Sequence, residues 1–387
     1  MNLVENTVPY KAHIDSVNIL FKSLCMKNLK FLLSLIVVNF VCSCNDDTTD
    51  IKMSLENNFE TIYDSIESVE LLPLETNAMH LIGANPQLEI SEDTYIIYDI
   101  ENSSIGRYSN SGQFLNKIGN KGNGPGEYTN ILNIQVMGDK LIVYSAPNFV
   151  HYYYLNGEHI NTIKLEKQGR QSYSVSDGVI TYYGYSSGES SRLSMLKEQE
   201  QVSYLPNDAK ILAYMSDSPI FSALNNEVYI LDSYSPTIYK YCNNTLSPYI
   251  KIDLGDYEVP REYYLFDDSF KAAEYLFERD FAIIKQYRES RFMSFIEIHI
   301  QHKDGTVLTN YGIGPKDSIK WFTTTNDNNS FLSGTFKCLD EECIYCLVDP
   351  AKLTDLKHTL PFVISNQDIL DNINVDDNYV IAKVSFK

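Results

Sequence analysis

Short segments in which apolar and polar residues alternate recur along most of the chain. Residues 95–99 and 105–108 have the pattern of two strands, followed by a turn at Gly112 and a further strand over residues 114–118. Alternation with a period of two, bounded by Gly and Asn, is typical of antiparallel strands joined by tight turns. The pattern therefore predicts a small β-sheet in this region.

The same layout returns about 45 residues further on, with strand patterns over 141–144, 150–154 and 159–165 and a turn at Gly157. A third copy spans residues 228–254, and a fourth spans 292–308 with a hairpin turn at 303–305. Residues 172–215 and 329–350 fill the remaining gaps at the same period. Four-stranded units repeated every 40 to 50 residues are typical of propeller blades. We therefore expect an all-β fold, a six-bladed β-propeller.

Closure of the ring follows from burial. Each small sheet has apolar faces that it cannot bury alone, so blades stack face to face until the ring closes. Residues 68–74 precede the first clear blade, and we expect them to complete the last one. On this reading six blades fit between Glu67 and Pro350, within a propeller domain that spans residues 65–387.

One stretch, residues 260–290, departs from the strand pattern. Apolar residues recur there at steps of three and four, which predicts helix: Phe270, Ala273, Phe277, Phe281, Ile284 and Tyr287. Pro260 suits a helix start, and Asp267-Asp268-Ser269 suits the cap of a second helix. We expect a helical insertion between late blades that covers apolar surface at one end of the ring, in preference to a functional lid.

The N-terminal segment has the layout of an export signal. A short basic stretch from Met26 precedes an apolar run over residues 31–41, which is too short for a membrane span, and then Val41-Cys42-Ser43-Cys44 resembles a lipobox. We expect residues 1–25 to be an upstream mis-start, 26–43 a lipoprotein signal peptide, and Cys44 the lipidated first residue. The alternatives are cleavage at a simple small-residue site or an uncleaved anchor. Residues 44–64 are predicted to be an acidic tether.

Composition narrows the function classes. The 387 residues carry a formal charge of −20, which disfavours binding to a nucleic-acid backbone. Tyr is abundant, with 29 residues, and favours strands over helices. In runs such as residues 152–154 and 182–185, successive tyrosines should face opposite sides of a strand. We expect them to pack between blades rather than to form a sugar-stacking platform.

Four glycines and a proline lie within residues 119–126, ahead of Glu127. Glycine allows φ > 0, and proline fixes its own φ, so the stretch is predicted to be a structural loop that crosses from one blade to the next: Gly119, Gly122, Gly124, Pro125, Gly126 and Glu127. The competing hypothesis is an anion cradle, but there is no Gly-Lys-Ser/Thr and a carboxylate ends the loop. On the structural hypothesis, Gly122→Val or Gly124→Val should lower the melting temperature without changing binding.

Neither catalytic residues nor a metal site can be assigned from the sequence, and no cofactor is expected. Cys338, Cys343 and Cys346 resemble part of a zinc site, but a second pair is missing and Cys343 and Cys346 should face opposite sides of a strand. A disulfide involving these or Cys242 stays open, since spacing does not determine pairing. No histidine lies beside a Ser or Cys in a recognisable nucleophile setting.

The string Gly-x-x-Gly-x-Gly-Pro-Gly-Glu-Tyr at residues 119–128, preceded by residues 111–118, resembles the signature of the six-bladed β-propeller lipoproteins of Bacteroidota, and more distantly the NHL-repeat propellers. The resemblance covers roughly residues 65–350 and implies a propeller in the cell envelope, with a helical insertion before a late blade. Asn45-Asp46-Asp47 is similar to the acidic signal that sends such lipoproteins to the cell surface. The family implies no settled activity, so no catalytic residue is transferred.

Three functions remain. The first is an outer-membrane, lipid-anchored binding module for a glycan, a peptide or an envelope protein. The second is a ring-centre metal-dependent lyase or hydrolase, which would need His, Asp or Glu converging from several inner strands. The third is a structural accessory of an outer-membrane uptake or signalling complex. The binding module needs only an exposed aromatic or polar rim, so we favour this hypothesis over the other two.

Overall fold

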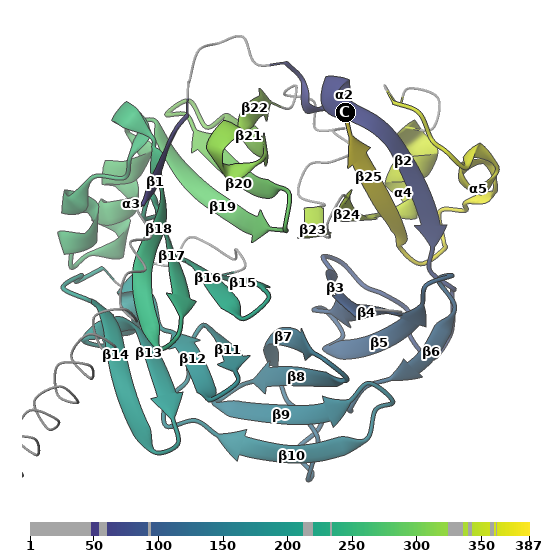
Figure 1. Ribbon diagram of the computed structural model, residues 1–387, viewed down its shortest axis with the longest axis horizontal. Coiled ribbons are helices and arrows are strands. Elements are labelled where there is room, and N and C mark those ends of the chain that lie inside the picture. The colour runs from purple at the N-terminus through teal and green to yellow at the C-terminus, as the bar shows by residue number, and fades with distance from the viewer. Residues whose placement is uncertain are drawn as a thin grey trace, which may run out of the picture. The chain divides into compact units, whose positions relative to one another are not determined.

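Six small antiparallel sheets follow one another along the chain and close into a ring, a six-bladed β-propeller (Figure 1). The computed structural model describes residues 48–53, 60–91, 94–211, 220–232, 234–323, 336–339, 343–356, 360 and 362–387. The predicted mis-start, the signal peptide and Cys44 lie outside the described residues. The predicted six-bladed fold is confirmed.

Blades I to VI are numbered along the chain, and the first strand of each lies innermost in the ring (Figure 1). Blades I and II contain β3 (Gln87–Ser91), β4 (Thr94–Asp99), β5 (Ser104–Ser109), β6 (Phe114–Lys117), β7 (Ile131–Met137), β8 (Lys140–Ser145), β9 (Phe149–Tyr154) and β10 (His159–Lys164). Blades III and IV contain β11 (Gln171–Val175), β12 (Gly178–Tyr182), β13 (Ser191–Lys197), β14 (Glu200–Pro206), β15 (Phe221–Leu224), β16 (Glu227–Leu231), β17 (Thr237–Cys242) and β18 (Thr245–Asp253). Blades V and VI contain β19 (Phe281–Glu289), β20 (Ser294–Gln301), β21 (Val307–Gly314), β22 (Lys320–Thr323), β23 (Phe336–Leu339), β24 (Cys343–Val348), β25 (Val380–Phe386) and β2 (Ile66–Pro73).

The ring closes through its N-terminal part, as expected. β2 pairs antiparallel with β25, for example Val69 with Val384, and so forms the outer strand of blade VI. The buried residues of β2, β24 and β25 then pack on apolar residues of blade V in one core cluster. Strands from both ends of the domain therefore share one sheet, and blade VI cannot form without either of them.

The predicted tether over residues 44–64 is wrong in part. β1 (Thr49–Lys52) pairs in parallel with β18 and adds a fifth strand to the outer edge of blade IV. Ile51 and Met53 are buried in the apolar core shared by blades IV and V, and α2 (Ile62–Ser65) follows, with Ile62 buried in a further core. The acidic composition hides these few apolar residues, whose burial is enough to hold the segment on the sheet.

The predicted helix over 260–290 is confirmed only at its start. After η2 (Gly255–Tyr257) and η3 (Arg261–Leu265), α3 (Ser269–Phe277) begins with Asp268 as its cap, whose carboxylate accepts from two backbone amides. Residues 281–289 form β19 instead, the innermost strand of blade V. A β-bulge between Ile284 and Gln286 places Ile284 and Tyr287 on the same face, so a strand imitates helical spacing.

The exposed side of α3 also differs from the prediction. Ala272 and Leu276 are buried, whereas Phe270 is 89% exposed and Phe277 is exposed as well. The insertion packs on the connection that follows blade III, because the backbone amides of Lys210 and Ile211 both donate to the Tyr264 carbonyl oxygen. It therefore covers apolar surface through its 3₁₀ segment and one side of α3.

Blade VI extends beyond Pro350, where the expected run of blades ends. Residues 349–379, which contain α4 (Pro350–Leu356) and α5 (Gln367–Asn372), separate β24 from β25. This insertion breaks the 45-residue period and hides the last strand from the repeat pattern. The remaining short helices are η1 (Tyr185–Ser187) and η4 (Lys316–Ser318).

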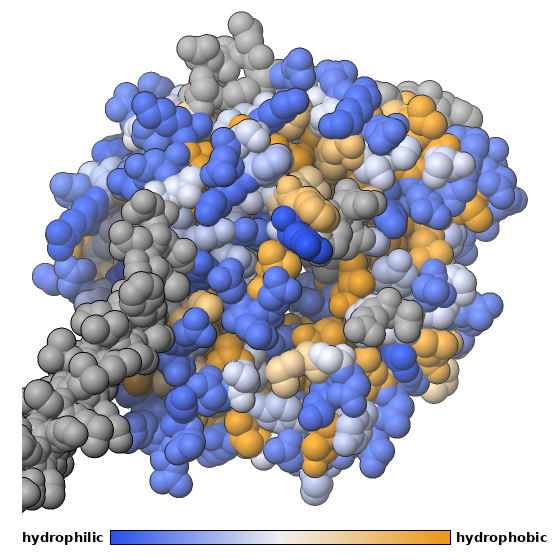
Figure 2. All heavy atoms as spheres, viewed as in Figure 1, coloured by the Kyte–Doolittle hydropathy of each residue, from blue (hydrophilic) through white to orange (hydrophobic). Residues whose placement is uncertain are grey.

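The alternation of antiparallel strands decides which connections share a face. Connections that follow the second and fourth strands of each blade emerge together, and we call this side the long-loop face. It carries residues 74–86, the glycine-rich stretch, the insertion after β18 and residues 349–379. Figure 2 shows hydrophilic side chains over most of the rim in this view and hydrophobic ones nearer its middle. No helix among the described residues is long and apolar enough to cross a membrane.

Candidate functional site

Three polar side chains lie on the innermost strands of alternate blades. Glu89 is on β3 of blade I, Tyr173 on β11 of blade III, and Arg288 on β19 of blade V. Each is half-buried, and they are close enough for the charges of Glu89 and Arg288 to act on each other and on the Tyr173 hydroxyl. We call these three residues the axial cluster, since the innermost strands surround the ring axis (Figure 1).

Glu89 carries the most perturbed carboxyl group of the axial cluster. Glu89 is half-buried, and its carboxyl group is surrounded by protein atoms. This burial raises the pKa of Glu89 to about 7, although the positive charge of Arg288 acts in the opposite direction. Within the described part of the chain, no side chain or amide hydrogen-bonds to this carboxyl group. A carboxyl group that is half protonated near neutral pH can both donate and accept a hydrogen bond.

The neighbouring side chains fix the other two members of the axial cluster. The Asn133 and Gln135 amides of blade II exchange hydrogen bonds of 2.8–3.1 Å with the backbone of Ser172 and Ser174, like a rung of a sheet, so the intervening Tyr173 is held in place. The Arg288 guanidinium donates to the Phe221 carbonyl oxygen of blade IV at 3.1 Å. Burial and the Glu89 charge raise the pKa of Tyr173 well above its ordinary value, so it stays a neutral phenol.

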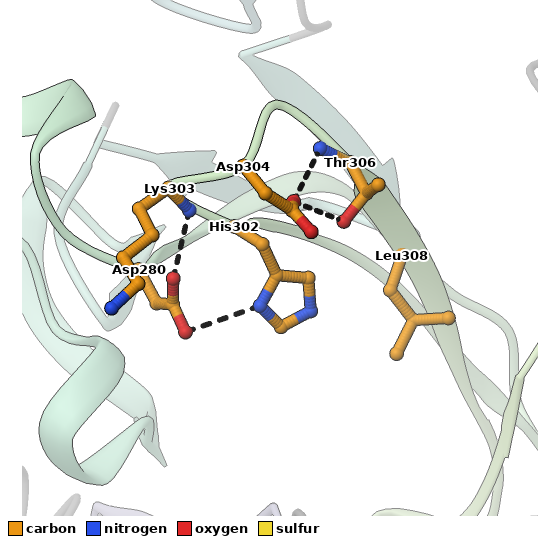
Figure 3. A pocket seen from close by; sticks show the side chains of 6 residues that line it. All are labelled: Asp280, His302, Lys303, Asp304, Thr306 and Leu308. Atoms are coloured by element: carbon orange, nitrogen blue, oxygen red, sulfur yellow. Dashed lines mark hydrogen bonds and ion pairs between the residues drawn. The ribbon is translucent and has the colours of Figure 1, made fainter.

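A concavity of about 370 Å³ lies on the long-loop face of blade V, away from the axial cluster (Figure 3). It is lined by Asp280, His302, Lys303, Asp304, Thr306 and Leu308. Asp280 accepts from the Lys303 amide at 2.8 Å and faces the His302 ring at 3.2 Å. Asp304 accepts from the amide and hydroxyl of Thr306. Both carboxylates thus support the β20–β21 hairpin, which leaves mainly the His302 ring edge and the Lys303 ammonium for a ligand.

The glycine-rich loop runs from the outer strand of blade I to the inner strand of blade II, at the place expected for it. Gly119 and Gly126 have φ of 65° and 74°, whereas Gly122 and Gly124 do not have positive φ. The strain expected at Gly122 and Gly124 therefore belongs to Gly119 and Gly126. A Cβ atom at Gly119 would lie 2.6 Å from the Tyr128 ring, and one at Gly126 would lie 2.7 Å from the His159 ring.

The amides of this loop point inward. The Gly124 amide donates to the Glu127 carboxylate at 2.8 Å, and the Gly122 amide donates to the Tyr128 carbonyl oxygen at 2.9 Å. The Glu127 and Tyr128 amides donate to carbonyl oxygens of the same loop. Pro125 sits between Gly124 and Gly126, at the tip. These four amides are therefore not available to an anion, which favours a structural role for the loop over an anion cradle.

The tyrosines and cysteines lie as their strand positions predict. Tyr153 and Tyr182 are fully buried between blades, while Tyr154 points outward. Cys343 and Cys346 of β24 belong to different core clusters on opposite faces of the sheet. Among the described residues no group of three His, Cys, Asp or Glu side chains could hold a metal ion. The Cys338 side chain lies outside the description, and Cys242 is half-buried.

The sequence gives little sign of the axial cluster. Arg288 falls in the segment interpreted as helix, and Glu89 lies in a short strand that the repeat pattern passes over. The available signal is a charged residue between Leu88 and Ile90, at a position where a first strand should be apolar. The Asp280–His302 pair is equally hidden, because its members are 22 residues apart.

Known structures share this architecture. A protein described as exported, from Bacteroides fragilis NCTC 9343, superimposes with a TM-score of 0.71 at 15% identity, covering 88% of this chain and 99% of its own. A DUF4221-family member from Bacteroides vulgatus gives a TM-score of 0.51 at 9% identity, covering 83% and 97%. A family model described as "Domain of unknown function (DUF4934)" matches residues 46–385. No curated protein is significantly similar in sequence.

Proposed function

The chain belongs to the DUF4934 family, and we propose that it is a cell-envelope lipoprotein whose propeller is a binding module that holds a polar group of its ligand at the axial cluster. The description of the Bacteroides fragilis relative as exported fits an envelope location. The lipobox-like Val41-Cys42-Ser43-Cys44 supports a lipid anchor at Cys44 in the outer membrane.

The axial cluster carries the proposal. Propellers bring residues from several blades together at their axis, and Glu89, Tyr173 and Arg288 come from three different blades. Together they offer a guanidinium, a phenol and a carboxyl group that can donate or accept. Such a mixed set suits hydroxyl, amide or carboxylate groups, as in a glycan or a peptide. A carboxyl group whose ionised form is penalised by partial burial costs stability near neutral pH, and that cost is typical of a functional site.

Binding can be tested on arrays of oligosaccharides and peptides probed with the purified lipid-free protein. Wild type should bind a defined class, and Arg288→Gln or Glu89→Gln should abolish that signal while the melting temperature shows a folded protein. Asp139→Asn, on an exposed turn of blade II, is the matched control. Unchanged binding by both axial variants would exclude the axial cluster as the ligand site.

The lipid anchor has a separate test. Cells that are fed an alkyne fatty acid should label the wild-type protein, and Cys44→Ala should lose the label and the membrane fraction. Equal labelling of Cys44→Ala would rule out lipidation at this residue.

The pH dependence of stability tests the unpaired Glu89. Because its folded pKa of about 7 lies above the unfolded value of 4.5, the folded state is penalised as pH rises from 4.5 through 7. Glu89→Gln should therefore stabilise the protein at pH 8, by up to about 3 kcal/mol, and change little at pH 4. Denaturant unfolding at both pH values measures this, and equal effects at both would contradict it.

The second candidate is ring-centre catalysis, and it is favoured by the same carboxyl group. A pKa near neutrality is what a general acid or base needs. The described residues supply no three-ligand metal set, so the catalytic reading rests on acid–base chemistry by Glu89 beside Tyr173. Turnover of an array-identified ligand, with a pH profile that inflects near 7 and is lost in Glu89→Gln, would establish it.

A further inference from the structure

A group of exposed apolar side chains lies on the long-loop face where blade VI meets blade I. Met79 is 61% exposed, Leu81 58%, Val375 54% and Ile100 43%. They come from three connections: residues 74–86 after β2, residues 100–103 after β4, and the end of residues 349–379. We call these four residues and their connections the junction surface. Apolar side chains gathered in this way on one surface are typical of an interaction site.

The backbone beneath these side chains is held firmly. The buried Asn378 side chain accepts from the Ile82 amide at 3.0 Å and donates to the carbonyl oxygens of Glu75 and His80 at 2.9 and 3.1 Å. The Gly83 amide donates to Asp99 at 3.0 Å, which ties the same connection to the end of β4. The apolar side chains are therefore presented on an ordered frame, which lowers the entropic cost of binding.

The same connections carry an excess of negative charge, with Lys117 of β6 close enough for its charge to act on His80. Residues 74–86, 99–103 and 374–379 contain no Lys or Arg and five carboxylates: Glu75, Asp99, Glu101, Asp376 and Asp377. Four of them accept hydrogen bonds, and every donor among the described residues is neutral, such as the Phe114 amide for Glu75 and the Ala84 amide for Glu101. Neutral donors satisfy the oxygen atoms but leave the charges in place.

The charge decides between the occupants of this surface. A second copy of the chain would bring carboxylates against carboxylates, and an anionic lipid surface would be repelled in the same way. The carboxylates do not form a group of three that could hold a metal ion. We propose that the junction surface binds a basic segment of a partner polypeptide. Its Lys or Arg side chains would face Glu75, Glu101, Asp376 and Asp377, the carboxylates that are not fully buried, and its apolar side chains would pack on Met79, Leu81, Ile100 and Val375. This site is separate from the axial cluster.

A random peptide library selected against the purified protein at low salt tests the proposal directly. Enriched peptides should combine Lys or Arg with aliphatic or aromatic residues, and their affinity should fall steeply with salt. Met79→Ser with Leu81→Ser should weaken binding about tenfold or more, since both side chains are exposed and make no part of the frame. Glu101→Gln with Asp376→Asn should weaken it several-fold and flatten the salt dependence.

Matched controls separate this surface from general acidity. Asp139→Asn with Glu158→Gln removes two charges from exposed turns on the opposite face of blade II and should leave binding unchanged. Peptides whose binding is lost in Arg288→Gln but kept in the Met79/Leu81 variant would belong to the axial cluster and would count against the junction surface, so the two sites are distinguishable. Peptides without basic residues, or equal binding by the Met79/Leu81 variant, would overturn the proposal. A wild-type dimer in sedimentation that Leu81→Ser dissolves would assign the surface to a second copy instead.

Discussion

The junction of blades III and IV and the junction of blades VI and I place a buried carboxylate at the same repeat position but surround it differently. Asp232 and Asp99 both lie at the end of a second strand, and both are fully buried. Asp232 is paired with the Arg192 guanidinium at 2.9 Å and accepts from the Tyr182 and Tyr185 hydroxyls. Among the described residues, Asp99 accepts from neutral groups only, the Gly83 amide and Asn102.

The groups packed around the two junctions also differ. At blades III and IV, the Tyr264 ring of the insertion stacks on Tyr185 with centroids 4.4 Å apart. The Arg192 guanidinium also lies over the Tyr185 ring, 4.3 Å from its centroid. At blades VI and I the His80 ring stacks on Phe114 with centroids 6.1 Å apart, and Lys117 lies close enough for its charge to act on His80. Among the described residues, however, no cation is paired with Asp99, and apolar side chains stay exposed. The same repeat position thus has two different surroundings. We call the junction of blades III and IV, where Asp232 is ion-paired, the sealed junction, and the junction of blades VI and I, where apolar side chains are exposed, the open junction.

The largest expected effect comes from breaking the sealed junction. Arg192→Met leaves Asp232 buried without its counter-charge, so the free energy of unfolding should fall by about 3–5 kcal/mol. Lys197→Met is the control, because its ion pair with Asp177 is exposed and should be worth about 0–1 kcal/mol. Chemical denaturation compares the two. A loss below about 1 kcal/mol for Arg192→Met would mean that the tyrosine hydroxyls alone stabilise Asp232.

The open junction depends on an amide side chain instead. Asn378→Ala removes three buried hydrogen bonds and should cost about 2–3 kcal/mol, with faster amide exchange over residues 74–86. Asn207 has the matching role at blades III and IV, where it bonds to the carbonyl oxygens of Tyr185 and Glu189. It is half-buried, so water can replace it and Asn207→Ala should cost about 1 kcal/mol. Equal losses of unfolding free energy for Asn378→Ala and Asn207→Ala would show that the two amide side chains contribute equally.

Acid should weaken the open junction first. Burial lowers the pKa of His80 to about 4 from 6.5, so the stability it contributes is complete above pH 6.5 and is lost as pH falls through 4. The loss at pH 5 should be about 2 kcal/mol, and His80→Gln should remove this part of the pH dependence. The connections of the sealed junction contain no histidine. Amide exchange at pH 5 and pH 7 should therefore change more in residues 74–86 than in residues 183–211.

The smallest effect concerns a third junction, between blades I and II. Its connection contains glycines with positive φ, where the other two junctions have a hydrogen-bonding Asn side chain. Gly119→Ala should cost about 1–2 kcal/mol, because its φ is positive and Tyr128 occupies the space of the new methyl group. Gly124→Ala should change stability by about 0.5 kcal/mol or less, since its φ is not positive and the nearest atoms belong to the Glu127 side chain, 3.0 Å or more away. Thermal unfolding compares them, and the reverse order would place the strain at Gly124.

The repeat could be read from the sequence because turn glycines such as Gly112 and Gly157 keep a fixed spacing and strands alternate in polarity. Ring closure followed from the need to bury sheet faces, which is why the pairing of β2 was predictable. Two insertions interrupted the period and hid β25. The bulge in β19 produced a helical spacing around Ile284, and tertiary pairing overrode the acidic composition at β1.

The axial cluster could not be predicted for a different reason. Glu89, Tyr173 and Arg288 are separated by roughly two blades each along the chain, and only the closed ring brings them near the axis. A charged residue in a strand is informative once the register shows that its neighbours are buried. The repeat pattern identifies blades through their second and third strands, so the first strands, which carry the site, are the least visible part of the signal.

The pairing of β1 on blade IV sets a limit on how the domain can stand at a bilayer. Only residues 45–48 separate Cys44 from Thr49, and an extended chain spans about 3.5 Å per residue. A lipid on Cys44 would therefore hold the outer edge of blade IV within about 20 Å of the membrane surface, so the linker between lipid and domain would be short. Blade I lies across the ring from blade IV (Figure 1). A lipid anchor would then be attached through blade IV, and blades I and VI would be free of it.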